Sequence, residues 1–132
     1  MKFKDFDEMY VLWKEAGLNL GSLQSEKEYT EKTIELNPNS SFVATEKEKI
    51  VGSVFGAFNG KRGWIYHLAV HKSWQNKGLG SLLLNKTEQA LKKSGAERIL
   101  LGVIKSNLKV LTFYKKHGYA KVTDAIWMGK NI

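Results

Sequence analysis

Residues 70–81 read Val-His-Lys-Ser-Trp-Gln-Asn-Lys-Gly-Leu-Gly-Ser, and they join an apolar segment at 64–70 to a helix that opens with three leucines at 82–84. The glycines at 78 and 80 leave the backbone N–H groups accessible at the helix N-terminus, where the helix macrodipole adds partial positive charge. The pattern Gln-x-x-Gly-x-Gly therefore predicts a strand-loop-helix unit that binds a pyrophosphate through its main chain.

Two familiar phosphate loops do not match this stretch. It contains neither the Walker pattern G-x-x-x-x-G-K-[ST] nor the dinucleotide pattern G-x-G-x-x-G. Taken alone, two glycines fit a tight turn without a ligand equally well. The surrounding order of segments favours the binding loop: a strand ending in Leu-Ala-Val at 68–70, the loop, a helix ending at 94–95, a strand at 99–103, an asparagine at 107, and Phe-Tyr at 113–114 followed by Gly-Tyr at 118–119.

This ordered set, spanning roughly residues 41–123, resembles the GNAT superfamily of acetyl-CoA-dependent N-acetyltransferases. The resemblance implies an α/β (α+β) fold, with a mixed, largely antiparallel central sheet, a splayed parallel strand pair and helices on both faces. It also implies acetyl-CoA as cosubstrate and direct acetyl transfer to a primary amine of a small-molecule or peptide acceptor. No metal is expected, because the chain has no cysteine and its three histidines lack the spacing of metal ligands. A non-catalytic protein that binds or senses acetyl-CoA on the same fold is the alternative.

The resemblance also assigns cofactor-binding residues by position. The backbone of the first splayed strand would pair with the pantetheine arm, the loop would hold the pyrophosphate, and an asparagine would hydrogen-bond the arm. The positions are Leu68, Ala69, Val70, Gln75, Asn76, Lys77, Gly78, Leu79, Gly80, Ser81 and Asn107. Gln75 could instead tie down the loop, and Asn107 could cap the last helix, a role that asparagine favours.

The candidate catalytic residues are Tyr114, which the resemblance implies, and His67, which is chosen for its chemistry and its place in the strand. Tyr114 stands where family members have the tyrosine that donates a proton to the departing sulfur; its other interpretation is a half-buried aromatic. The positions at which family members often have a glutamate base hold Trp64 and Gly102, and neither can accept a proton. His67 is the nearest titratable side chain on that strand, and imidazole suits proton transfer near neutral pH, although a histidine in an apolar strand is usually structural.

Composition and charge bound the remaining possibilities. The chain has 132 residues, 42% of them hydrophobic, one proline and no cysteine, which predicts one domain over residues 1–132 and excludes a cysteine nucleophile. It has no apolar run long enough to cross a membrane and no signal-peptide pattern at its N-terminus, so we expect a cytoplasmic protein.

Charge divides the chain into two halves. Residues 1–48 hold six basic and ten acidic residues, a net charge of −4, whereas residues 49–132 hold fifteen and three, a net charge of +12. The positive half contains the loop and would attract the polyanionic coenzyme A, while the acidic half would favour a cationic amine. The lysines of the positive half are scattered over helices and do not form a run interleaved with aromatic residues, which argues against nucleic acid as the main partner. An exposed edge strand could also pair two copies into a homodimer.

Local patterns predict the individual elements. We expect four helices: residues 5–16, a helix that opens at the capping box Ser25–Glu28 and runs to 37–38, residues 78–94, and residues 108–117. Strands are expected at 41–45, at 50–58, in the segment that ends at residue 70, and at 98–103. A terminal hairpin is expected from residues 119–123 and 125–129. An edge strand at residues 1–3 is either very short or lost.

Overall fold

The computed structural model describes all 132 residues, from Met1 to Ile132. Its internal contacts group the chain into two compact units, residues 1–102 and residues 103–132. The first unit holds a sheet and three α-helices, and the second holds two short helices and the C-terminal segment.

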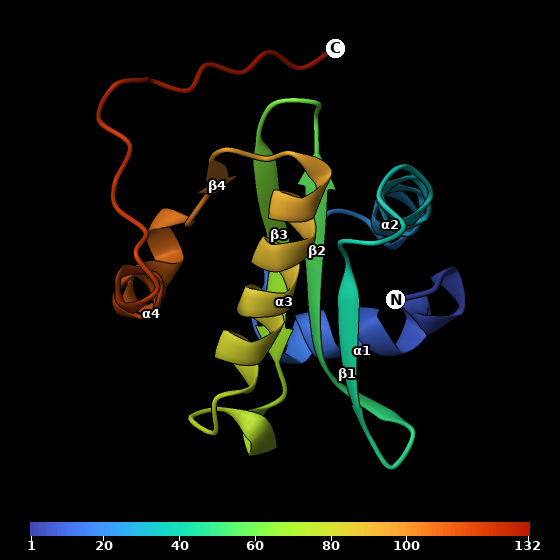
Figure 1. Cartoon of the computed structure of the whole chain (residues 1–132). Helices are drawn as coiled ribbons and strands as arrows, with labels where there is room; N and C mark the ends of the chain where they lie inside the picture. The colour runs from blue at the N-terminus through green and yellow to red at the C-terminus, as the bar shows by residue number, and fades with distance from the viewer. The chain divides into compact units, whose positions relative to one another are not determined.

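The first unit is built on a four-stranded mixed sheet, shown in Figure 1. Its strands are β1 (Phe42–Glu46), β2 (Lys49–Phe58), β3 (Gly63–Val70) and β4 (Ile99–Leu101), and they lie in this order. The β1–β2 and β2–β3 pairs are antiparallel, and the β3–β4 pair is parallel. This confirms the predicted mixed, largely antiparallel sheet, although β4 is shorter than the strand expected at 98–103.

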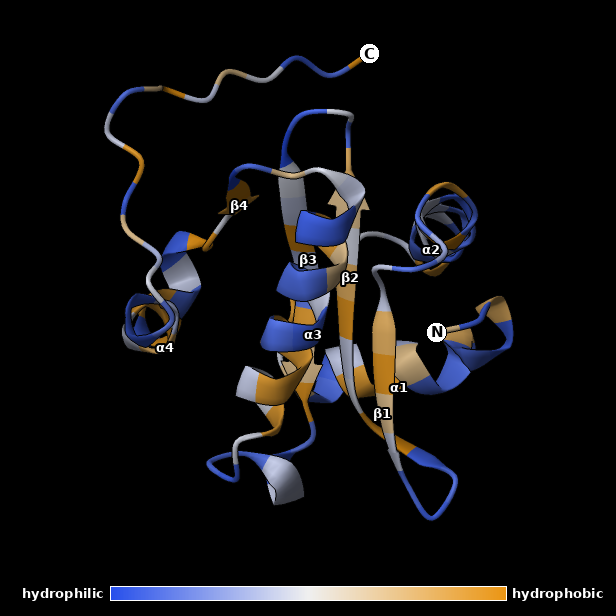
Figure 2. Cartoon of the chain, in the orientation of Figure 1, coloured by the Kyte–Doolittle hydropathy of each residue, from blue (hydrophilic) through white to orange (hydrophobic).

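Helices cover both faces of this sheet, as predicted. A Cβ placed on Gly52 or Gly56 of β2 would come within 3 Å of side chains of α3 (Leu79–Ser94), so these glycines let that helix pack closely. The alternate residues Ser53 and Phe55 face the opposite side and meet Trp13 of α1 (Phe6–Glu15). Figure 1 shows α3 in front of β2 and β3 and α1 behind them, and in Figure 2 the outward turns of α3 are mostly hydrophilic.

The core between α1 and the sheet confirms the amphipathic pattern predicted for residues 5–16. One stripe of α1 is fully buried, and it packs against Phe55 of β2 and Ala69 of β3. The stripe consists of Phe6, Met9, Leu12 and Trp13. Burying a side chain of this size contributes about 1.5–3 kcal/mol, so α1 is anchored by packing more than by helix propensity.

The N-terminal elements differ in detail from the local patterns. Of the two outcomes expected for an edge strand at residues 1–3, the structure shows its loss: a 3-10 helix, η1 (Phe3–Asp5), leads into α1. The predicted start of α2 (Leu23–Leu36) is wrong, because the N-cap is Ser22, three residues before Ser25, and its Oγ accepts a hydrogen bond from the Ser25 N–H at 3.1 Å. Ser22 has the extended backbone that an N-cap residue requires, whereas Ser25 already lies inside the helix.

The second unit departs furthest from the expected elements. The helix predicted over 108–117 is a 3-10 helix, η3 (Lys105–Val110), followed by the short α4 (Leu111–Lys116). It ends as predicted at Gly118, which is left-handed at φ +86° and donates its N–H to the Lys115 carbonyl. The terminal hairpin is absent, since residues 119–132 form no strand. Alternating apolar and polar residues allow a segment to form a strand, but the strand forms only where a neighbouring strand supplies the backbone hydrogen bonds.

None of the helices is both long and apolar enough to serve as a membrane span.

Candidate active site

The loop before α3 has the backbone expected of an anion-binding turn. Asn76 and Gly78 are both left-handed, at φ +61° and +84°, and Gly78 is the N-cap of α3 without any side-chain cap. The first bond within the helix runs from the Leu82 N–H to the Gly78 carbonyl, so the N–H groups of Leu79 and Gly80 have no acceptor inside the helix. Left-handed turns and a helix N-terminus both aim N–H groups at an anion.

The side chains of this loop brace it from within. Gln75 Nε2 donates to the Val70 carbonyl at 3.0 Å, so of its two interpretations the structure shows the one that ties down the loop. The Lys77 ammonium lies 5.6 Å from the centre of the Trp74 ring, and Trp74 Nε1 donates to Glu46 Oε2 at 2.8 Å. These contacts hold the segment between β3 and α3 to one end of the sheet, where β1 and β3 both finish.

One edge of β3 is open where the resemblance places the pantetheine arm. The parallel pairing with β4 covers only Gly63 to Ile65, which face Ile99 to Leu101. Further along, Ala69 and Val70 pair with β2 on their other side and have no β4 partner. An unpaired strand edge presents N–H and C=O groups that an extended ligand can join.

A β-bulge at His67 reshapes β3 at the start of this open edge. Tyr66 pairs with Phe55 and Ala69 with Ser53, so two residues of β3 stand opposite one of β2. His67 has φ +50°, a left-handed conformation uncommon outside glycine. Its carbonyl accepts a 3.4 Å hydrogen bond from Ser53 Oγ, which in turn accepts one from Trp13 Nε1 at 2.8 Å. Two buried side chains thus hold the bulge in place.

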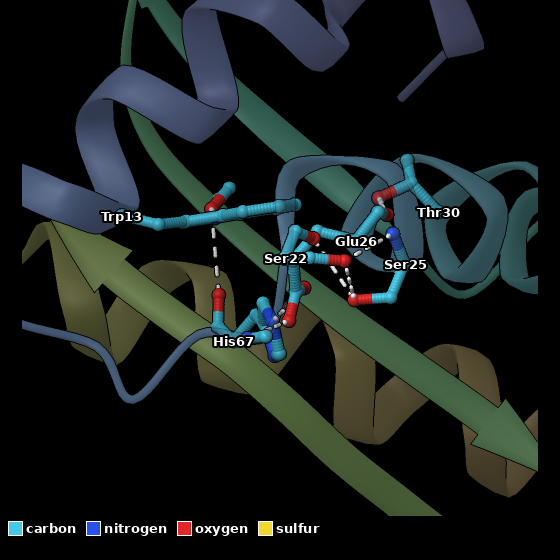
Figure 3. Close-up of polar contacts among 8 residues, drawn as sticks. Trp13, Ser22, Ser25, Glu26, Thr30 and His67 are labelled. Atoms are coloured by element: carbon cyan, nitrogen blue, oxygen red, sulfur yellow. Dashed lines mark hydrogen bonds and ion pairs between the residues drawn. The ribbon is translucent and has the colours of Figure 1, made fainter.

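The bulge directs the His67 ring towards α2, where it meets a carboxylate. His67 Nε2 lies 3.0 Å from Glu26 Oε2, and the two side chains are 19% and 11% exposed. The other oxygen, Oε1, accepts a hydrogen bond from the Gly21 N–H at 2.8 Å. Figure 3 shows the Glu26 side chain reaching from α2 towards the ring.

Aromatic rings enclose this imidazole–carboxylate pair. The His67 ring centre lies 4.7 Å from that of Trp13, 5.5 Å from Tyr29 and 5.6 Å from Phe55. Burial raises the pKa of Tyr29 to about 12, despite a hydrogen bond with Thr33 that acts in the opposite direction. Burial also raises the pKa of Tyr66, whose ring stacks on that of Trp64 at 6.2 Å. Both phenols remain protonated at neutral pH.

Sequence reasoning did not identify Glu26, Ser53 or Trp13 as parts of this cluster. Glu26 could have been recognised as a buried residue once the helix register was known, because it lies on the buried stripe of α2 with Thr30 and Thr33. A carboxylate at a buried helix position requires a partner, since burying an unpaired charge is costly. Ser53 and Trp13 carry no comparable local signal, because their hydrogen bond joins residues forty positions apart.

Tyr114 and Asn107 belong to the second unit. The Tyr114 ring lies 5.1 Å from Phe113 and 5.8 Å from Tyr119, and burial raises the pKa of its phenol. Asn107 sits at a kink inside η3, with φ −126° and ψ 40°, and the residue that precedes α4 is Val110. The interpretation of Asn107 as the cap of the last helix is therefore wrong.

A separate groove of about 620 Å³ lies between α1 and the β1–β2 turn. Four carboxylates line it, and none of them belongs to the loop or to the His67 cluster. They are Asp7, Glu8, Glu15 and Glu48. The acidic character of the N-terminal half is thus partly gathered on one surface. Residues 1–132 contain no cluster of three or more His, Asp or Glu side chains placed to hold a metal ion.

Comparisons with known proteins agree with this geometry. The model of the acetyltransferase (GNAT) family matches residues 6–119, and the chain therefore belongs to this family. It is 29% identical over 128 residues to the acetyltransferase SG1711 of Sodalis glossinidius (strain morsitans), covering 97% of this chain and 89% of that one.

Two solved structures show the same fold. One is AAC(6')-Iy bound to the bisubstrate analogue CoA-S-monomethyl-acetylneamine, with a TM-score of 0.77 at 13% identity over 100% of this chain and 95% of that one. The other is a protein from Pyrococcus horikoshii assigned as an acetyltransferase, with a TM-score of 0.77 at 22% identity over 91% of this chain. This chain spans only 41% of the length of that protein. The GNAT fold, acetyl transfer and coenzyme A binding follow from the family.

Proposed function

We propose that this chain transfers the acetyl group of acetyl-CoA directly to a primary amine, as one domain over residues 1–132. The observation that carries the proposal is the loop before α3: left-handed Asn76 and Gly78 precede an uncapped helix N-terminus, directly after a strand with an open edge. In the proposal the pyrophosphate binds the main chain of residues 75–81, and the pantetheine arm pairs with Leu68, Ala69 and Val70. Asn107 would hydrogen-bond the arm.

The reaction needs a proton acceptor and a proton donor. An alkylamine has a pKa near 10.4, so only about one molecule in a few thousand is nucleophilic at neutral pH. The amine nitrogen attacks the thioester carbon, the C–S bond breaks, and the products are an N-acetyl amine and the coenzyme A thiol. The nitrogen must lose its protons as the C–N bond forms, and the sulfur must gain one.

His67 and Tyr114 are the proposed partners for these proton transfers. His67 accepts a proton from the amine, directly or through water, at the bulge where the edge of β3 opens. Tyr114 donates its phenol proton to the departing sulfur. A pKa raised by burial keeps that phenol protonated, which is the state that a donor requires. Trp64 and Gly102 take no part in proton transfer.

We propose a cationic alkylamine or basic peptide as acceptor. The net charge of −4 over residues 1–48 supports this, as does the gathering of four carboxylates along the α1 groove. A surface of negative potential raises the local concentration of cationic molecules around the protein. Another structure of the same fold is named as an aminoglycoside acetyltransferase, and aminoglycosides are therefore one acceptor class to test.

The test is thiol release from acetyl-CoA measured against a panel of polyamines, aminoglycosides, amino acids and basic peptides. We expect release only when a suitable amine is present, together with a rise in melting temperature on adding coenzyme A. A protein that stays folded but shows no heat of binding with coenzyme A or acetyl-CoA would contradict the proposal.

A sensor of acetyl-CoA is the alternative, and the absence of carboxylates at Trp64 and Gly102 favours it. Such a protein would be stabilised by acetyl-CoA but would release no thiol with any amine. The two functions therefore separate in the same assay.

A further inference from the structure

We propose that Glu26 is the positioning residue of the active site: it fixes the tautomer of His67 so that Nδ1 accepts the proton of the attacking amine. This inference rests on the proposed function. It adds a residue from α2, outside the strand and loop elements that hold the cofactor. The side chain of Glu26 touches His67 and Gly21, and no role in contacting substrate is assigned to it.

The tautomer follows from hydrogen-bonding chemistry. A carboxylate has no hydrogen to donate, so at the 3.0 Å contact with Glu26 the proton must reside on Nε2 of His67. A neutral imidazole carries only one N–H, and Nδ1 therefore keeps its lone pair. This lone pair is the proton acceptor in the proposal, because the contact with Glu26 engages Nε2.

The carboxylate is itself locked in position. Oε1 is held by the Gly21 N–H and Oε2 by His67, while the helix around Glu26 is fixed by the Thr30 hydroxyl, which donates to the Glu26 carbonyl at 2.7 Å. With each oxygen engaged and little exposure to water, the side chain has one orientation. A fixed negative charge at this distance also stabilises the imidazolium that forms when Nδ1 takes a proton.

The surroundings of His67 contain no competing charge. From α1 it meets Trp13, from β2 it meets Phe55 and Ser53, and from α2 it meets Tyr29 besides Glu26. The pKa of Tyr29 is about 12, so this phenol is neutral across the working range. Of the contacts named here, the one with Glu26 is the one that carries a charge, and the inference therefore assigns control of the imidazole to this residue.

The substitution Glu26→Gln reverses the tautomer while keeping the shape. Its amide oxygen can accept from Gly21, and its NH₂ group then donates to Nε2 of His67, which moves the ring proton to Nδ1. We expect thiol release to fall by about 10²-fold in kcat, the scale of general-base catalysis, with the KM for acetyl-CoA unchanged. Glu31→Gln, an exposed position on the same helix, should match the wild type.

Two further variants separate positioning from simple damage. Glu26→Asp keeps a carboxylate, so its rate should lie above that of Glu26→Gln. In a His67→Gln background, Glu26→Gln should cause no further loss of rate, because both act on one proton transfer. The inference would be overturned if the rate losses of the two single variants multiplied in the double variant, or if Glu26→Gln kept the wild-type kcat.

The tautomer can also be read without turnover, from the ¹⁵N shifts of the His67 ring in the full chain. We expect the proton on Nε2 in the wild type and on Nδ1 in Glu26→Gln. A wild-type ring with its proton on Nδ1 overturns the inference even if the enzyme is active. If the wild type releases no thiol with any amine, the proposed function is contradicted. The ¹⁵N shifts of the ring still decide whether Glu26 sets the tautomer of His67.

Discussion

His67 shows how one strained residue can organise a site. A non-glycine residue in the left-handed region costs about 1–3 kcal/mol and persists only where its surroundings impose it. Here Ser53 and Trp13 fix the carbonyl, while the ring is held by Glu26 and three aromatic neighbours. Without the bulge, adjacent residues 66 and 67 would point to opposite faces of the sheet, and the imidazole could not meet α2.

The role of Tyr114 gives a prediction at this scale. Tyr114→Phe removes the proposed donor but keeps the ring, so we expect kcat to fall by about 10²-fold while the affinity for coenzyme A stays near that of the wild type. Since burial raises the pKa of this phenol, its deprotonation should lower the rate only at a more alkaline pH than an ordinary tyrosine would. Steady-state kinetics and calorimetry check both statements. An unchanged kcat would remove Tyr114 from the mechanism.

At the scale of elements, the start of α3 matters most. Gly78 combines a left-handed conformation with the N-cap position, and no side chain caps the helix. A Cβ at Gly78 would meet no atom within 4 Å, so the cost of a larger residue there is backbone strain and not collision. The glycine is required for the backbone angle that keeps N–H groups aimed at one point.

Gly78→Ala and Gly17→Ala form a matched pair. Gly17 is also left-handed, at φ +76°, and its Cβ would also meet no atom within 4 Å, but it follows α1 and lies outside the loop. Each change should cost about 1 kcal/mol of unfolding free energy. Only Gly78→Ala should weaken coenzyme A binding, by about tenfold for a loss near 1.4 kcal/mol. Urea unfolding and calorimetry measure the two effects, and equal affinities would exclude the loop as the phosphate site.

At the scale of the whole molecule, burial of phenols links stability to alkaline pH. The folded chain holds the proton of Tyr29 more tightly than the unfolded chain does, with a pKa of about 12 against an ordinary 10.0. The stabilisation from this group is complete below pH 10 and is lost as the pH rises towards 12. Tyr66 and Tyr114 shift in the same direction, so stability should fall through this range.

Tyr29→Phe tests that linkage. Phenylalanine has no proton to lose, so the free energy of unfolding should decline less steeply above pH 10 than in the wild type. Urea midpoints measured at about pH 9, 10 and 11 would give the slopes. Parallel slopes for the two proteins would show that the phenol of Tyr29 makes no contribution to the alkaline loss.

Most elements that depend on residues close together in the sequence were predicted correctly, whereas those that depend on distant partners were not. The helix at 78–94, the β1–β2 hairpin and the end of α4 at Gly118 depend on neighbours within a few residues, and the structure confirms them. The start of α2 was misplaced by three residues because two serines compete for one cap. The terminal hairpin was wrong because pairing requires a partner strand that no local pattern guarantees.

The sequence by itself determined the order of the elements from α1 to α4, the GNAT resemblance and the glycine turn before α3, because glycine spacing, helix caps and alternating apolar residues act over short distances. Tertiary structure alone decided the bulge at His67 and its pairing with Glu26, a contact across forty-one positions of the chain. That contact exists because α2 packs on the same face as α1, with its one buried carboxylate over the bulged strand. A buried charge is stable there only because folding brings an N–H group and an imidazole to its two oxygens.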